Sequence, residues 1–134
     1  THPNHLIIGS DQVAVLGNRI LGKPGNHAEA FRQLSAASGA SVRFFTGIAL
    51  LDAATGTLQL DCVPLTVHFK QLSDAQIDRY LRADTPYDCA GSFKAEGLGV
   101  SLFRSTEGPD ATSLIGLPLI RLVDMLNAAG FEIP

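Results

Sequence analysis

The sequence contains no tryptophan and few residues of several other types: its 134 residues include two cysteines, two tyrosines, one methionine and three lysines. Two cysteines are too few for a disulfide framework or a cysteine-based zinc site, which favours the reducing cytoplasm as the compartment. No apolar run approaches the roughly 18 residues that a membrane span requires, so no membrane-spanning segment is expected. The formal net charge of −3 argues against a broad nucleic-acid-binding surface.

Apolar residue types, in contrast, make up 46% of the chain, and no internal repeat, linker or low-complexity segment interrupts them. A chain of this length suits one domain, residues 1–134, whose core is large enough to fold without disulfides. The sequence opens with Thr1-His2-Pro3-Asn4 and has no initiator methionine. We therefore expect it to be part of a longer chain that is truncated at the N-terminus.

Two short polar segments stand out from the apolar surroundings. The first, residues 9–12, reads Gly-Ser-Asp-Gln and is followed by Lys23; the second, residues 91–97, reads Gly-Ser-Phe-Lys-Ala-Glu-Gly and contains Lys94. Each combines an acid, an amide or hydroxyl group and a nearby lysine on glycine-rich backbone. Charged groups of this kind bind phosphate oxygens and divalent cations well, so the pair predicts a site for a metal-bound polyphosphate.

Each segment also has a simpler interpretation. Asp11 follows an apolar strand, as ligand-binding groups do in open α/β sheets, but a turn aspartate that bonds its own backbone would look the same. Lys94 and Glu96 fit either a binding site or a solvated loop with an incidental ion pair. The nearby glycines, such as Gly91 and Gly97, indicate a close backbone approach or positive φ angles.

Other chemical motifs are weak. Residues 17–23 match the spacing of a phosphate-binding P-loop, but Pro24 stands where the loop needs Ser or Thr, and proline removes a backbone donor. No histidines have the spacing of metal ligands, and no serine lies in a nucleophile-elbow pattern. Cys62 and Cys89 are interpreted as small core residues rather than nucleophiles.

The hydrophobic pattern predicts alternating strands and helices. Short strands are expected at 6–8 and 13–16, on either side of Asp11 and Gln12, and a long hairpin at 42–51 and 57–69, with a bulge or a sheet edge at Pro64. Asn26 and Ser73 are expected to cap helices, a further strand is expected at 100–104, and Pro118 should start the last helix. The predicted class is α/β: a single domain with a mixed, largely antiparallel extended sheet flanked by helices.

At these residues the chain resembles the Maf family, septum-formation-inhibitor-like proteins that are nucleoside triphosphate pyrophosphatases with an ITPase-like fold. The resemblance runs through nearly the whole chain in one order. Its landmarks are Gly9-Ser10-Asp11-Gln12, Leu21-Gly22-Lys23-Pro24, Ala28-Glu29-Ala30, Thr46-Gly47, Leu72-Ser73, Ala90-Gly91-Ser92-Phe93-Lys94 and Gly116-Leu117-Pro118-Leu119.

The resemblance implies a role for each residue of the two segments. Asp11 would be the proton acceptor that activates water, or would hold the metal that does so, and Lys23 and Lys94 would neutralise phosphate oxygens. The cofactor would be a divalent cation (Mg²⁺, Mn²⁺ or Co²⁺), and attack on the α-phosphorus would release pyrophosphate. Gln12 and Glu96 resemble the specificity residues of the 7-methyl-GTP pyrophosphatase subgroup, where dTTP/UTP-specific members usually have Thr and Gln.

The resemblance has one gap. Family members begin with a Ser-rich, Arg-containing phosphate-binding loop and have a further site glutamate in that N-terminal region, and neither is present in this sequence. We therefore expect this chain by itself to have an impaired site and exposed apolar surface. The alternative function is that of a non-catalytic nucleotide-binding regulator associated with septum formation. The family also suggests a homodimer.

Overall fold

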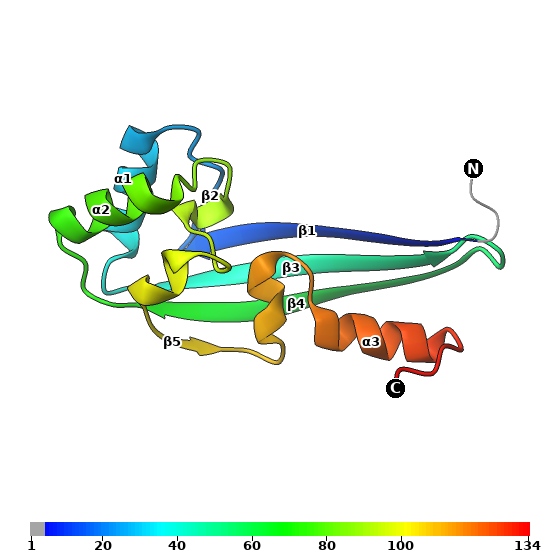
Figure 1. Cartoon of the computed structure of the whole chain (residues 1–134). Coiled ribbons are helices and arrows are strands. Elements are labelled where there is room, and N and C mark those ends of the chain that lie inside the picture. Colours follow the sequence, from blue (N-terminus) through cyan, green and yellow to red (C-terminus); the bar gives the residue numbers. More distant parts are fainter. Residues whose placement is uncertain (1–4) are drawn as a thin grey trace.

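The computed structural model describes residues 5–134 and contains one long sheet with helices arranged along it (Figure 1). The strands are β1 (Leu6–Leu16), β2 (Arg19–Leu21), β3 (Ser41–Asp52), β4 (Thr57–Phe69) and β5 (Phe103–Glu107). The helices are α1 (His27–Ala37), α2 (Asp74–Asp84) and α3 (Leu119–Ala128), with short 3₁₀ helices η1 (Ala90–Ser92), η2 (Leu98–Leu102) and η3 (Ala111–Ile115).

The sheet has the strand order β2-β1-β3-β4-β5, and every strand pair in it is antiparallel. The expected extended, largely antiparallel sheet and the long hairpin are confirmed. The parallel component implied by a mixed sheet is not found in residues 5–134. It is absent because β1 lies between β2 and β3: these two strands, which α1 connects, run in the same direction but do not pair with each other.

The first strand differs from the prediction of two short segments. β1 runs without interruption through Asp11 and Gln12, and β3 pairs with it at each position from Leu6 to Leu16. Gly47 lies opposite Asp11 in this register. Two polar residues do not interrupt a strand when a long partner supplies the backbone hydrogen bonds, since the ladder is formed by the main chain.

Pro64 lies where β4 has a partner on one side only. It pairs in register with Phe45 of β3, and β5 pairs with β4 from Thr66 onward. The expected edge is therefore confirmed and no bulge occurs at Pro64; the irregularity in β4 falls between His68 and Phe69, facing β5. Proline needs no hydrogen-bond acceptor, so this unpaired position accommodates it.

The expected helix starts are mostly confirmed. The Asn26 side chain accepts the Glu29 N–H, and Ser73 forms a reciprocal capping box with Gln76. Pro118 directly precedes α3. The strand expected at 100–104 is displaced to Phe103–Glu107, because the Lys94 carbonyl accepts the N–H groups of Gly97 and Gly99 and starts η2 instead.

Both hydrophobic clusters lie on one face of the sheet. Val42 and Phe44 of β3 pack with α1 and α2 in the larger cluster, while Ile48 and Leu50 pack with α3 in the smaller one. These four residues occupy alternate positions in one strand, so their side chains point to the same face. Thr46 lies between the two groups, on the same face.

The opposite face of the sheet is largely uncovered. Leu58 and Leu60 of β4 are 54% and 69% exposed, and Ile7 and Val13 of β1 are 43% and 39% exposed. None of the described helices takes part in a buried cluster on this face. The apolar alternation of β4 thus faces outward in its first half and inward in its second. Within residues 5–134, no helix combines the length and apolar character needed to cross a membrane.

Candidate functional site

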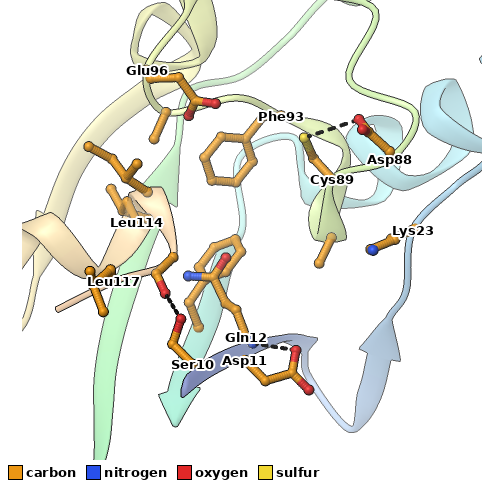
Figure 2. Close-up of a pocket in the computed structure, with 15 residues that line it drawn as sticks. Ser10, Asp11, Gln12, Lys23, Asp88, Cys89, Phe93, Glu96, Leu114 and Leu117 are labelled. Carbon is orange, nitrogen blue, oxygen red and sulfur yellow. Dashed lines mark hydrogen bonds between the residues drawn. The ribbon is translucent and has the colours of Figure 1, made fainter. Parts of the chain in front are cut away.

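A cavity of about 470 Å³ lies between the two hydrophobic clusters (Figure 2). β1 contributes residues 10–12, the segment around η1 contributes residues 88–90 and 93, and the end of η3 and the turn after it contribute residues 114–117; Lys23, Phe44, Ala95 and Glu96 complete the lining. Segments far apart in the sequence therefore meet at one place on the sheet.

Four of the five residues predicted from sequence line this cavity: Asp11, Gln12, Lys23 and Glu96. Figure 2 shows Glu96 at one end and Asp11 at the other, with Gln12 and Phe93 between them. Lys94 is not part of the lining. The structure shows its backbone N–H donating to the Tyr80 hydroxyl at 2.8 Å. A phosphate-binding role for Lys94 stays a prediction.

Asp11 lies in the middle of β1 and not, as predicted, at a carboxyl end of a strand. Its Oδ1 accepts the Gln12 backbone N–H at 2.8 Å, and the side chain is exposed. Because neighbouring residues in a strand point to opposite faces, Asp11 and Gln12 diverge, as Figure 2 shows. Asp11 still reaches the rim of the cavity, since β2 pairs only with Ala14–Leu16 and leaves this part of β1 at the sheet edge.

Gln12 points into the covered side of the sheet. Its Nε2 donates to the Ser113 carbonyl at 2.8 Å and to Thr46 Oγ1 at 3.0 Å. In Figure 2 its amide oxygen lies on the side of Phe93 and the cavity. Two residues earlier, Ser10 Oγ donates to the Gly116 carbonyl at 2.7 Å, so β1 is bonded to the η3 region at two alternate positions on the same face.

The second polar segment is held by the rest of the protein at several points. Gly91 and Ser92 have φ angles of +78° and +66°, and the buried Ser92 hydroxyl donates to Gln33 Oε1. Further on, the Leu98 N–H donates to Asp84 Oδ2 at 2.8 Å. A Cβ on Gly97 would lie 2.6 Å from the same Asp84 oxygen. The expected close backbone approach is confirmed, and the approaching groups belong to the protein itself.

Sequence reasoning missed Phe93, which forms part of the cavity wall. It is 5% exposed and packs edge-on against Phe44, with ring centroids 5.3 Å apart. Phe93 also contacts Phe69 and Phe103 in the same way. The sequence did contain a signal for Phe93: an aromatic residue within a glycine-rich polar segment often packs into the hydrophobic core and holds the loop against it.

The lining is predominantly acidic. It includes three carboxylates, Asp11, Asp88 and Glu96, and one ammonium group, Lys23. This balance favours a ligand that carries positive charge in addition to phosphate, and it disfavours bare polyphosphate. Among residues 5–134, no cluster of three or more His, Cys, Asp or Glu side chains is arranged to hold a metal ion. Mg²⁺ commonly needs only one or two carboxylates when substrate phosphates complete its ligands, and Asp11 fits that requirement.

The cysteines do not add a nucleophile. Burial, followed by the neighbouring Asp88 carboxylate, raises the pKa of the Cys89 thiol in the cavity lining, which disfavours the reactive thiolate. The interpretation of Cys62 as a core residue was wrong. Cys62 is exposed, because it belongs to the outward-facing half of β4 together with Leu58 and Leu60.

Comparison with known proteins extends these observations. The family described as "Maf-like protein" matches residues 1–129. A protein of Pseudomonas fluorescens named 7-methyl-GTP pyrophosphatase is 72% identical over 134 residues, covering 100% of this chain and 70% of the relative. Proteins of the same name from Pseudomonas aeruginosa and Alcanivorax borkumensis are 65% and 57% identical over 133 residues, covering 99% of this chain and 69% and 68% of the relatives. The landmarks of the sequence, the meeting of four of them in one cavity and this close similarity lead to one conclusion: the chain belongs to the Maf family.

Proposed function

We propose that the protein hydrolyses 7-methyl-GTP to 7-methyl-GMP and pyrophosphate. The main support is the name that relatives carry at 57–72% identity over at least 99% of this chain. The cavity adds an independent argument, since its two ends differ chemically. Glu96, Gln12 and Phe93 suit a purine base that is donor-rich and positively charged, while Asp11 and Lys23 suit the phosphates.

The reaction assigned to the phosphate end is a single displacement. A water oxygen forms a bond to the α-phosphorus, and the bond from that phosphorus to the bridging oxygen breaks, so pyrophosphate leaves with the electron pair. Asp11 accepts the proton of the water. Its Oδ1 already accepts the Gln12 N–H, which leaves Oδ2 for the proton. Bonding to that N–H also fixes the carboxylate at the rim of the cavity.

Phosphate charge is neutralised at the same end. Lys23 is the one cation among the lining residues, and it approaches from the side of the cavity opposite Leu114 (Figure 2). Lys94 is assigned to a more distant phosphate oxygen. A divalent cation (Mg²⁺, Mn²⁺ or Co²⁺), held by Asp11 and phosphate oxygens, would neutralise the charge that one lysine cannot balance in an acidic cavity.

Specificity for the base is assigned to the end of the cavity that contains Glu96. Methylation at N7 makes the guanine base cationic, and the Glu96 carboxylate attracts that charge while accepting N–H groups. A neutral glutamine in this place would accept hydrogen bonds without the charge. The Phe93 ring adds an aromatic surface for the base.

The test measures pyrophosphate release by the purified full-length protein from 7-methyl-GTP, GTP, dTTP and UTP with Mg²⁺, Mn²⁺ or Co²⁺. The expected result is metal-dependent release that is fastest with 7-methyl-GTP and falls by about 10²-fold or more in Asp11→Asn. Asp124→Asn on the exposed side of α3 is the matched control and should keep full activity. Nucleotide binding without release would instead support the regulatory alternative. Equal release from dTTP would contradict the proposed specificity.

A further inference from the structure

The side-chain amide of Gln12 has one orientation in this structure. The Ser113 carbonyl, 2.8 Å from the end of the side chain, can only accept a hydrogen bond, so the Gln12 nitrogen must face it. The second N–H of the same nitrogen reaches Thr46 Oγ1 at 3.0 Å. Both amide donors are therefore used inside the protein, which leaves the Gln12 carbonyl oxygen for the cavity.

Thr46 is the residue that completes this arrangement. It is the register partner of Gln12 in the adjacent strand, and it is 0% exposed. Its hydroxyl lies 3.5 Å from the Ser113 carbonyl that also accepts from Gln12. The hydroxyl thus accepts one hydrogen bond and donates another, and three groups from β1, β3 and η3 form a closed network.

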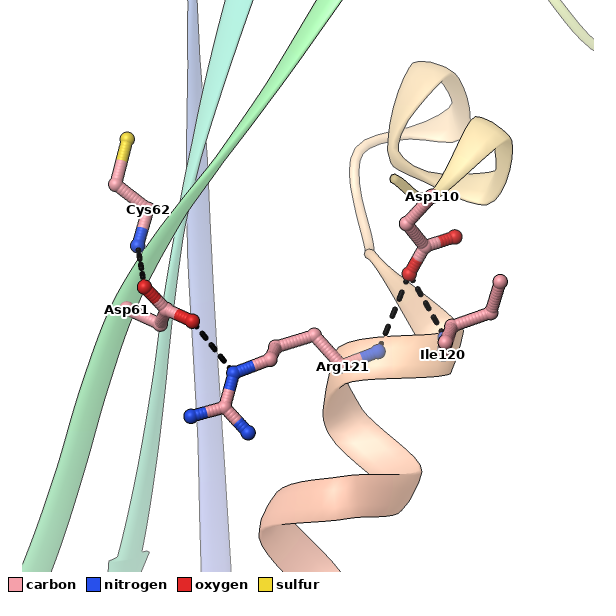
Figure 3. A network of polar contacts seen from close by, with 5 residues as sticks. All are labelled: Asp61, Cys62, Asp110, Ile120 and Arg121. Carbon is pink, nitrogen blue, oxygen red and sulfur yellow. Dashed lines mark hydrogen bonds and ion pairs between the residues drawn. The ribbon is translucent and has the colours of Figure 1, made fainter. Parts of the chain in front are cut away.

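The Ser113 carbonyl, which accepts the hydrogen bonds of this network, belongs to η3, and Asp110 holds η3 in place. Asp110 accepts the N–H of Thr112 at 3.1 Å at the start of η3. Its other oxygen accepts the N–H groups of Ile120 and Arg121 at 2.8 and 3.2 Å, as Figure 3 shows. Asp110 is 2% exposed. η3 and α3 are therefore joined by one buried carboxylate, and the Ser113 carbonyl has a defined position relative to the sheet.

We propose that Thr46 is a positioning residue for base recognition: together with the Ser113 carbonyl, which orients the amide, it holds Gln12 so that Oε1 accepts an N–H from the Watson–Crick edge of a guanine-type base. The inference rests on the proposed function and deepens it. A guanine-type base offers donors at N1 and N2, whereas adenine offers neither at these positions. A site that presents a fixed acceptor rejects a base lacking the donor, because the acceptor is then left without a partner.

The test compares Thr46→Val, which keeps the shape and removes the hydroxyl, with Thr46→Ser, which keeps the hydroxyl. The readout is the ratio of kcat/KM for GTP to that for ATP, which differ at the edge in question. The preference for GTP should fall about tenfold in Thr46→Val and stay within about twofold of the original in Thr46→Ser. A folded Thr46→Val with an unchanged preference would overturn the proposal.

A second measurement needs neither turnover nor a variant. In the ¹⁵N-labelled protein, the side-chain amide protons of Gln12 should exchange with solvent at least about tenfold more slowly than those of the exposed Gln71. Equal exchange would overturn the fixed orientation. The two proposals fail differently: absence of pyrophosphate release from every nucleotide removes the proposed function, whereas rapid Gln12 exchange in an active enzyme removes only the role of Thr46.

Discussion

Replacing Tyr80 by phenylalanine tests how the segment that carries Glu96 is held. Tyr80 lies in α2 and is 5% exposed, and its hydroxyl accepts the Lys94 backbone N–H at 2.8 Å. Phenylalanine keeps the ring and removes the acceptor, so the main change is one backbone N–H without its partner. Asp84, one turn further along α2, still holds the Leu98 N–H.

The magnitude follows from the burial of the bond. Leaving a buried donor unsatisfied costs about 1–3 kcal/mol. Lys94 is half-buried, so water replaces part of the lost bond, and we expect Tyr80→Phe to lower the free energy of unfolding by about 1–2 kcal/mol. For a chain of this length that corresponds to a Tm lower by about 3–8 °C. Because the loosened segment contains Glu96, KM for 7-methyl-GTP should rise more than kcat falls.

The assay is thermal and urea unfolding followed by circular dichroism, with Tyr87→Phe as the matched control. The Tyr87 hydroxyl forms a hydrogen bond with His27 of α1 at 3.0 Å, so its loss should leave KM unchanged. Burial, the largest cause, raises the pKa of the Tyr80 phenol and favours the neutral form in the folded protein. The stability from this group is therefore present below the ordinary tyrosine pKa of about 10 and is lost as pH rises above it. A Tyr80→Phe protein as stable as the original at pH 7 would refute the reasoning.

Three further changes test other parts of the structure. Gly91→Ala should destabilise the protein by about 1–3 kcal/mol in urea unfolding, because φ is +78° and the new Cβ would lie 3.3 Å from Phe44. Gly17→Ala is the control: its φ is also positive but the space around it is open, so it should lower the free energy of unfolding less. An equal loss in both variants would contradict the role of the Phe44 contact. The hydrogen bond from Arg121 lowers the pKa of Asp61, so the stability that this ion pair supplies is present above the ordinary aspartate range and is lost as pH falls through the lowered pKa. The difference in free energy of unfolding between the original protein and Asp61→Asn should therefore shrink between pH 7 and pH 3. A constant difference would contradict a stabilising Asp61–Arg121 pair. Glu96→Gln should reduce the kcat/KM preference for 7-methyl-GTP over GTP about fivefold, because the attraction between an exposed carboxylate and a nearby cationic base is worth about 1 kcal/mol. An unchanged preference would show that the charge of Glu96 does not select the methylated base.

Much of the fold is predictable because local signals agree with the tertiary structure. Asn26 and Ser73 cap helices through their own side chains, and the β3–β4 hairpin follows from two long apolar runs around a short turn. The prediction failed at Asp11, where local polarity suggested a break. The continuous β1 depends on the ladder to β3, which residues distant in the sequence supply.

The candidate site was predictable in chemistry and less so in geometry. Residue type and family order identified four residues that line one cavity: Asp11, Gln12, Lys23 and Glu96. That Thr46 and the Ser113 carbonyl orient Gln12 could not be inferred from sequence, because these contacts span 34 and 101 positions. The place of Lys94 outside the lining could not be inferred either, because it depends on how residues 91–97 fold against α2, where the Lys94 backbone N–H bonds Tyr80.

The most direct test of the proposed function is a competition between equal amounts of 7-methyl-GTP and GTP in H₂¹⁸O, with the products analysed by mass spectrometry. The account predicts that 7-methyl-GTP is consumed first, and that its products are 7-methyl-GMP with one ¹⁸O atom and unlabelled pyrophosphate. Attack of water at the α-phosphorus requires this distribution. Label in the pyrophosphate, or consumption of both nucleotides at the same rate, would contradict it.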